Sequence, residues 1–273
     1  MAQMNATSVG NLAVWHHPTA GRPIARVLLV HGISEHSGRH LPTVQALVAK
    51  NIEVVRLDLR GAGQSGGRRQ WISSFNDYVA DVAAVHGWIG AKLPELPLFV
   101  LGHSLGGAIS VYFTRQYGPL LRGLILSAPA HLPGRALGPV KIFVGKLLAP
   151  LLPTFRLYSS RPEALSRRPE VAEAYRQDPL AFRFNTLQQG RLVLEALARV
   201  PETAQAITTP TLIAHGTHDT VILPEGSFAI LRALASRSKE LHYLPGVYHE
   251  PHLDLGAEAY FGLVTRWIAQ RSA

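Results

Sequence analysis

The sequence predicts an α/β fold in which helices cover both faces of a mostly parallel sheet. Apolar runs that suit buried strands alternate along the chain with stretches of helical periodicity. This alternation favours parallel strands joined by helical crossovers. With 273 residues, 47% of them hydrophobic, the chain can build one large domain with an insertion. The expected core comprises residues 1–129 and 207–273, and the expected insertion comprises residues 130–206.

Continuous apolar runs predict the strands, and one-sided apolar spacing predicts the helices. Five strand runs and a weaker sixth are Arg26–Gly32, Ile52–Leu57, Leu98–Leu101, Leu121–Leu126, Thr211–Ala214 and Glu240–Leu244. The expected helices are Phe75–Leu93, Ala108–Tyr117, Phe228–Ala235 and Glu258–Gln270. Leu12–Trp15 is expected to add an antiparallel edge strand.

The alternation of strands and helices breaks between about Pro129 and Pro210, where prolines are frequent and buried-strand runs are missing. We predict a helical cap over the carboxyl ends of the strands, with one helix within 185–198. Residues 139–152 are apolar nearly all round. They form either the core of the cap or a lid that touches lipid or lines an acyl channel. The segment is too short to span a membrane but suits shallow interfacial contact.

Composition excludes several classes of protein. The formal net charge of +9 comes from scattered basic residues rather than a dense basic block, so we expect no nucleic-acid partner and at most a loose attraction to anionic lipid. The absence of cysteine excludes disulfides, thiolate catalysis and Cys-based zinc sites. No secretory signal pattern opens the chain, which predicts a cytoplasmic protein with peripheral membrane contact at most. Nothing in the sequence indicates an oligomeric state.

The most informative motif is Gly102-His103-Ser104-Leu105-Gly106, which joins a strand-like run to a helix-compatible stretch. In this context a G-x-S-x-G match predicts a nucleophile elbow, a sharp turn that lifts the serine hydroxyl above the sheet. The positive end of the following helix then lies near the hydroxyl. Ser104 is therefore the predicted nucleophile, against the alternative of a Gly-rich turn with an ordinary surface serine.

A serine hydroxyl needs an adjacent base, usually a histidine that a carboxylate orients. These partners are expected in loops at the carboxyl ends of later strands. Asp219 follows the run 211–214, and His249 follows the run 240–244. The order serine, acid, histidine is the one expected after an elbow of this kind. We predict that Ser104, Asp219 and His249 form a catalytic triad.

Other histidines and carboxylates compete for these roles. His103, His218 and His252 are expected to have packing or solvent-exposed roles. Asp178 and Asp254 are alternatives to the predicted acid, but neither follows a predicted core strand.

The reaction also needs donors for the oxyanion of a tetrahedral intermediate. The amide of Leu105, directly after the nucleophile, is one predicted donor. The other is expected in the loop after the first long strand, where Gly32 lets the backbone approach and Ile33 supplies the amide. One such donor contributes about 3 kcal/mol to transition-state stabilisation.

Two other patterns suggest different chemistries. Residues 61–66, Gly-Ala-Gly-Gln-Ser-Gly, match the G-x-G-x-x-G pattern of dinucleotide-binding proteins, but no clear helix follows them. We expect a tight structural loop there, in which Asp58 or Arg60 bonds the backbone. A metal hydrolase would use His215, His218, Asp219 and His249, but their spacing matches no standard ligand set.

Three stretches resemble the monoacylglycerol lipase family of the α/β-hydrolases. Residues 31–39, His-Gly-Ile-Ser-Glu-His-Ser-Gly-Arg, resemble the family's H-G-x-x-E-H-S-G-R signature. Residues 58–65 resemble its D-x-R-G-x-G-x-S loop, and residues 102–107 resemble its G-H-S-x-G-G elbow. Asp219 and His249 fall where the family has its acid and base. The likeness is weakest across the cap.

This resemblance implies an α/β-hydrolase fold with a helical cap insertion and roles for two charged residues. Glu35 and Arg39 would line the polar end of the pocket and help to hold a glycerol head, directly or through the loop. Considered without the resemblance, the two residues are as well explained by a loop-stabilising ion pair. Ile33 stands where the family often has a smaller residue, which affects the shape of the pocket rather than the donor amide.

The sequence therefore predicts a serine hydrolase that cleaves monoacylglycerol to fatty acid and glycerol through an acyl-enzyme, with no metal or organic cofactor. A lysophospholipase or general carboxylesterase with the same triad is an alternative, and a non-catalytic binding protein of the same fold is a remote one. The expected partners are a lipid-ester substrate and, transiently through the cap, a membrane surface.

Overall fold

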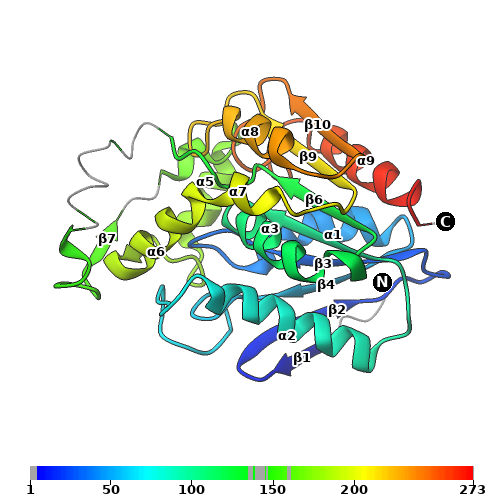
Figure 1. The fold of residues 1–273 in the computed structure, drawn as a ribbon, viewed down its shortest axis with the longest axis horizontal. Coiled ribbons are helices and arrows are strands. Elements are labelled where there is room, and N and C mark those ends of the chain that lie inside the picture. The colour runs from blue at the N-terminus through cyan, green and yellow to red at the C-terminus, as the bar shows by residue number, and fades with distance from the viewer. Residues whose placement is uncertain (1–4, 135–137, 139–144, 146, 159–160, 273) are drawn as a thin grey trace.

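A computed structural model of the chain describes residues 5–134, 138, 145, 147–158 and 161–272. Its centre is an eight-stranded sheet with the order β1-β2-β4-β3-β5-β6-β9-β10 (Figure 1). The strands are β1 (Asn5–Val9), β2 (Leu12–His17), β3 (Ala25–Val30), β4 (Ile52–Leu57), β5 (Leu98–His103), β6 (Gly123–Ser127), β9 (Thr211–Gly216) and β10 (Lys239–Leu244). β2 pairs antiparallel with β1 and β4, and every pairing from β4 to β10 is parallel. The predicted, mostly parallel sheet is confirmed.

Helices cover both faces of this sheet, as predicted. One apolar core lies under α2 (Asn76–Lys92), α3 (Leu105–Tyr117), α7 (Val200–Ala204) and α8 (Glu225–Ala233). The other core lies under α1 (Leu41–Val48) and α9 (Ala257–Ala269) (Figure 1). β3, β4, β6 and β9 are buried along their whole length, which explains why they appear in the sequence as continuous apolar runs.

One expectation about the edge of the sheet was wrong, and one helix was not predicted. Leu12–Trp15 is antiparallel as predicted, but β1 lies outside it and forms the actual edge. β1 contains only two apolar residues, so its pairing depends on a backbone hairpin, in which Gly10 takes a φ of +59°. The sequence analysis also missed α1, a helix of eight residues that starts next to a proline.

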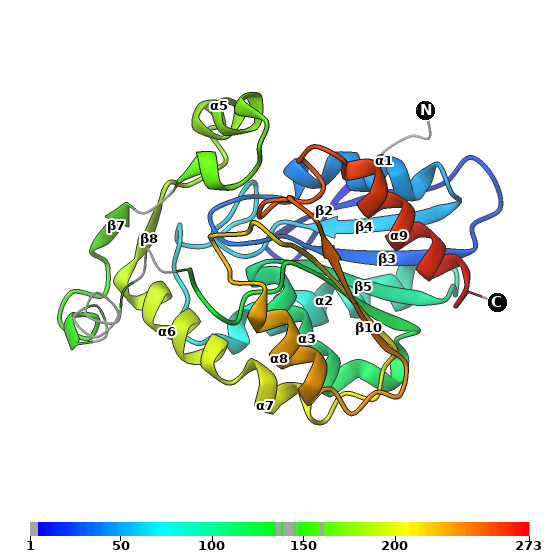
Figure 2. The same ribbon diagram turned by 90° about the horizontal axis from the view of Figure 1, so that it is seen from above.

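Apart from α7, the elements between β6 and β9 lie outside the sheet and its covering helices, with β7 and α6 at the left of Figures 1 and 2. These are β7 (Arg156–Tyr158), η3 (Pro162–Ala164), α5 (Pro169–Gln177), β8 (Phe184–Thr186) and α6 (Leu187–Ala198). β7 and β8 form a small antiparallel sheet that sequence periodicity did not predict. Half of the apolar segment 139–152, namely residues 139–144 and 146, lies outside the described residues. Several of its described side chains and those just after it are exposed, namely Leu147 (64%), Leu151 (75%) and Phe155 (55%).

Among the described residues, no helix combines the length and the apolar character that a bilayer crossing requires.

Candidate active site

Ser104 lies in a tight turn between the end of β5 and the start of α3. Its φ of 53° and ψ of −119° fall in a region that L residues rarely adopt. The glycines on either side are sterically required. A Cβ at Gly102 would collide with the Gly106 carbonyl, and a Cβ at Gly106 would collide with the Val30 carbonyl. The backbone therefore has the geometry that a nucleophile elbow needs.

The three residues of the predicted triad meet at the carboxyl ends of β5, β9 and β10. His249 Nε2 lies 3.0 Å from Ser104 Oγ, and His249 Nδ1 lies 2.7 Å from Asp219 Oδ2. All three are buried, with exposed fractions of 5% for Ser104, 3% for Asp219 and 4% for His249. Ser104 and His249 are 145 positions apart in the sequence, and Asp219 and His249 are 30 positions apart. Their contacts have the order that activates a serine hydroxyl.

Electrostatics in this group favour an ionised carboxylate beside a basic imidazole. Burial alone would lower the pKa of His249, but the charge and hydrogen bond of Asp219 outweigh it, so the pKa is raised above 6.5. Burial would raise the pKa of Asp219, yet His249 and His215 lower it well below its usual range. The group therefore combines an ionised carboxylate with an imidazole of raised pKa, which are the properties that a general base and its orienting acid need.

His215 is a residue of this site that the sequence analysis considered only as a metal ligand. Its Nε2 donates to Asp219 Oδ2 at 3.0 Å, and its Nδ1 lies 2.6 Å from Ser227 Oγ. The other carboxylate oxygen, Asp219 Oδ1, accepts from the amides of Val221 and Ile222. The carboxylate is thus held on both oxygens. The signal in the sequence was the position of His215 at the end of β9, four residues before the acid.

The two predicted oxyanion donors lie where the loops after β3 and β5 approach each other. Within the described residues, the backbone N–H groups of Ile33 and Leu105 have no hydrogen-bond acceptor. The loop after β3 is held by its own side chains. Gly32 donates its amide to Glu35 Oε1 at 2.5 Å, and its carbonyl accepts from His31 Nδ1 at 2.7 Å.

Glu35 and Arg39 are buried and engaged with other side chains. Glu35 Oε1 also accepts from His40 Nε2 at 3.1 Å. Arg39 makes two bonds to Glu250, at 2.6 and 2.9 Å, and its Nε lies 3.5 Å from Glu35. The bonds to Glu250 join the loop after β3 to the segment that carries His249, whereas the contacts of Glu35 lie within the loop. This arrangement of Glu35 and Arg39 is that of a loop-stabilising ion pair, the explanation that the two residues suggest without the family resemblance.

The same loop is bonded to the segment between β6 and β9. Ser34, which follows Ile33, has a left-handed φ of 61°. Its hydroxyl donates to Asn185 Oδ1 and its carbonyl accepts from the Tyr175 hydroxyl, both at 3.1 Å. His36 Nε2 donates to Asp178 Oδ2 at 2.8 Å. These bonds hold Ser34 in a conformation that non-glycine residues avoid.

Two of the competing histidines, His103 and His252, lie in a buried cluster of rings next to His249. His103 has its ring centroid 5.0 Å from that of His249, and His252 stacks on His40 at 4.2 Å. Burial lowers the pKa values of His103 and His252 well below 6.5, so these rings pack in neutral form. His218 is exposed. Of the competing acids, Asp178 pairs with His36, and Asp254 pairs with Arg167.

The glycine-rich stretch 61–66 is a tight loop, as the sequence analysis expected. Asp58 accepts from the amides of Ser37 and Gln64, so it does bond the backbone. Arg60 instead pairs with Asp81 at 2.7 Å. Among the described residues, no group of three or more histidine, aspartate or glutamate side chains is arranged to hold a metal ion.

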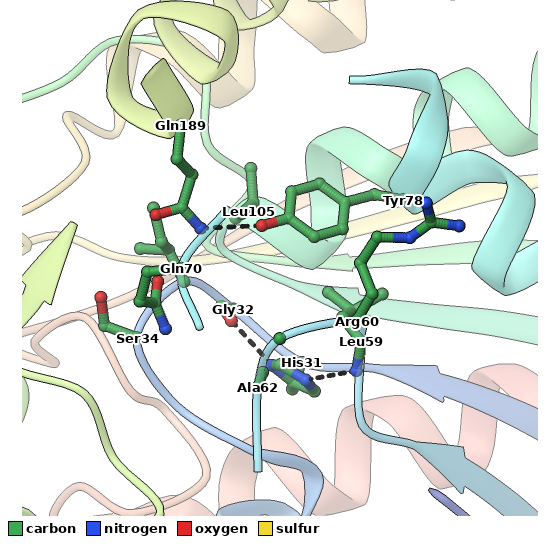
Figure 3. Close-up of a pocket in the computed structure, with 12 residues that line it drawn as sticks. His31, Gly32, Ser34, Leu59, Arg60, Ala62, Gln70, Tyr78, Leu105 and Gln189 are labelled. Carbon is green, nitrogen blue, oxygen red and sulfur yellow. Dashed lines mark hydrogen bonds between the residues drawn. The ribbon is translucent and has the colours of Figure 1, made fainter. Parts of the chain in front are cut away.

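A small pocket lies beside the predicted oxyanion donors (Figure 3). Ile33 and Leu105 line it together with Gln70, Tyr78 of α2 and Gln189 of α6. The side chains of Gln70 and Gln189 were not singled out from the sequence, because nothing local marks two glutamines 119 positions apart (189 − 70) as neighbours.

The chain is similar to known proteins over most of its length. Residues 21–256 match a protein-family model described as serine aminopeptidase, S33. A monoacylglycerol lipase from Mycolicibacterium smegmatis is 34% identical over 257 residues, which cover 93% of this chain and 91% of the relative. A monoglyceride lipase from Mus musculus is 31% identical over 93% of this chain and 85% of its own length. The crystal structure of a Paleococcus ferrophilus monoacylglycerol lipase has a TM-score of 0.86 and 25% identity, covering 98% of this chain and 99% of its own.

The fold and the serine, histidine and aspartate at its carboxyl edge define a serine hydrolase of the α/β-hydrolase class. Within that class the chain belongs to the monoacylglycerol lipase family, and it is a carboxylic ester hydrolase.

Proposed function

We propose that this protein hydrolyses monoacylglycerols to free fatty acid and glycerol through an acyl-enzyme on Ser104. The observation that carries the proposal is the contact of His249 with both Ser104 Oγ and Asp219 Oδ2. The monoacylglycerol lipases that resemble the chain over most of its length supply the substrate class.

In the proposed mechanism Ser104 Oγ attacks the ester carbonyl while its proton moves to His249 Nε2. Asp219 orients the ring and stabilises the imidazolium that forms. His249 then passes the proton to the leaving oxygen of glycerol. In the second half of the reaction a water molecule attacks the acyl carbonyl while His249 takes its proton. His249 then returns this proton to Ser104 Oγ as the fatty acid leaves.

The amides of Ile33 and Leu105 would stabilise the oxyanion that forms in both halves of the reaction. Glu35 would act on glycerol through the loop, because its bond to the Gly32 amide sets the course of the backbone next to the Ile33 donor. Arg39 would act by holding Glu250, the residue after the general base.

Residues 130–206 would act as a cap that binds the acyl chain and shields the reaction from water. The exposed apolar side chains Leu147, Leu151 and Phe155 support transient contact of this cap with a lipid surface. Large exposed apolar side chains of this kind suit shallow contact with a lipid surface. Shallow insertion at this point would bring the site close to its lipid substrate.

The proposal is tested with purified protein and a substrate panel. The panel contains monoacylglycerols of several chain lengths, lysophospholipids, short-chain esters and an aminoacyl anilide, the last because of the peptidase description of the family model. We expect the highest kcat/KM on a monoacylglycerol and no turnover by Ser104→Ala. A higher kcat/KM on a lysophospholipid or on the anilide would contradict the substrate assignment.

A further inference from the structure

The pocket beside the oxyanion loop holds two buried hydrogen-bond acceptors that the mechanism does not use. Gln70 and Gln189 line it and are each 2% exposed. Within the described residues, neither Gln70 Oε1 nor Gln189 Oε1 has a hydrogen-bond partner. A buried amide oxygen without a donor is unfavourable, so two of them in one pocket point to a ligand that supplies donors.

The side chain of Gln189 and the backbone of Gln70 are held by neighbours, and both side-chain oxygens are left unpaired among the described residues. Gln189 Nε2 donates to the Tyr78 hydroxyl at 2.7 Å, which leaves Oε1 as the open end of the amide (Figure 3). The backbone of Gln70 is bonded on both sides, through its amide to Gly61 and through its carbonyl to the Thr186 hydroxyl. Burial raises the pKa of Tyr78 to about 12, so the phenol stays neutral. The two acceptors and the phenol are therefore neutral, and Arg60, which also lines the pocket, is paired with Asp81.

We propose that this pocket is a subsite for a hydroxyl group that the ester substrate carries close to its scissile carbonyl. The proposal rests on the proposed function, because it takes Ile33 and Leu105, which also line the pocket, as the amides that face that carbonyl. The hydroxyl donates its one proton to one of the two side-chain oxygens, Gln70 Oε1 or Gln189 Oε1. A neutral acceptor pair suits a hydroxyl, since it offers no charge to a phosphate or an ammonium group.

Two parts of an ester can present such a hydroxyl, namely the acyl chain and the alcohol. The strand order places the pocket on the β3 and β4 side of β5, whereas Asp219 and His249 follow β9 and β10 on the other side. The leaving alcohol receives its proton from His249 and therefore lies on the side away from the pocket. The geometry thus favours a hydroxyl near the carbonyl end of the acyl chain, as in 2- and 3-hydroxy fatty acids.

The test compares kcat/KM within two pairs of esters of one chain length. The first pair is the methyl ester of a 2- or 3-hydroxy fatty acid and that of the unsubstituted acid. The second pair is the monoacylglycerol and the methyl ester of the unsubstituted acid. Because one hydrogen bond to a buried acceptor changes binding by about tenfold, we expect the wild-type protein to favour the hydroxylated member about tenfold.

Gln70→Met and Gln189→Met keep the side-chain length and each removes one acceptor, so the double variant is expected to bring the ratio close to one. The two single variants show which oxygen accepts the proton. Tyr78→Phe frees the Gln189 amide to rotate and is expected to lower the ratio partly. Gln188→Met is the matched control, since that partly exposed side chain bonds Arg191 and does not line the pocket. The control should keep the wild-type ratio. Labelling of Ser104 by a fluorophosphonate reports whether each variant is folded.

A preference in the first pair that the Gln→Met changes remove assigns the hydroxyl to the acyl chain, and one in the second pair assigns it to the alcohol. Either result supports the subsite. Equal rates within both pairs for the wild type, or a preference that survives in the double variant, would overturn it. A wild-type protein that neither cleaves any ester nor labels at Ser104 would contradict the proposed function itself.

Discussion

The Oδ2 atom of Asp219 lies 2.7 Å from His249 Nδ1 and 3.0 Å from His215 Nε2, so one carboxylate oxygen binds two imidazoles. The first bond orients the proposed general base. The second bond restrains the carboxylate of Asp219. The side chains of His215, Asp219 and His249 are all buried. The position of His249 therefore depends on a residue that has no contact with the serine.

Removal of His215 tests this dependence. We expect His215→Ala to lower kcat by about tenfold to a hundredfold, because small displacements of reacting groups have effects of that size. KM should change little. His215→Gln, which can still donate to Asp219, should restore part of the loss. His218→Ala is the control, since His218 is exposed and, among the described contacts, its side chain bonds only Thr217. Equal losses at both positions would show that His215 does not position the acid.

The pH dependence of kcat/KM follows from the raised pKa of His249. The imidazole must be neutral to accept the proton of Ser104, so activity falls as pH drops below the pKa of His249. Because Asp219 raises that pKa above 6.5, the acidic limb of the profile should lie above pH 6.5. In Asp219→Asn the limb should move to lower pH, with a rate loss of about 10⁴-fold. A limb that stays in place in this variant would exclude His249 as the titrating group.

The sequence predicted those parts of the fold and site that have a local signature. β3 and β9 are buried on both faces and appear as apolar runs. Ser104 and Asp219 follow runs of this kind within a few residues, and His249 follows the weaker, partly exposed run of β10. β1 was missed because its five residues carry no apolar alternation.

Contacts between distant segments could not be predicted in this way. Ser34 and Asn185 are 151 positions apart, and the bond between them depends on how the chain between β6 and β9 folds back. Gln70 and Gln189 meet for the same reason. Hydrogen bonds between single polar side chains leave no periodic pattern, whereas strands and helices do.

Ser34 offers a test of how that fold-back positions the Ile33 amide. Ser34→Ala keeps the left-handed φ of 61° but loses the bond to Asn185, so the strain of about 1–2 kcal/mol is no longer offset. Ser34→Gly loses the same bond without the strain. We expect kcat to fall more in Ser34→Ala than in Ser34→Gly, with KM little changed in both. Equal or reversed effects on kcat would argue against a role for the backbone conformation.

Binding to lipid vesicles tests the proposed surface contact of the cap. Leu147→Ser and Leu151→Ser remove exposed apolar area and should weaken sedimentation with vesicles of mixed neutral and anionic lipid. Each change should lower the partition coefficient severalfold, since burial of a leucine side chain is worth about 1.5–3 kcal/mol when complete. Leu120→Ser is the matched control, because Leu120 is as exposed as Leu147, at 64%, and lies in a different segment. Vesicle binding that falls equally in the control would indicate no specific contact.

The most direct test of the central claim is mass-spectrometric mapping of the protein after brief exposure to a fluorophosphonate ester. The account predicts one modified residue, Ser104, with labelling lost in Ser104→Ala and strongly slowed in Asp219→Asn. An unmodified Ser104, or labelling of another residue that persists in Ser104→Ala, would contradict it.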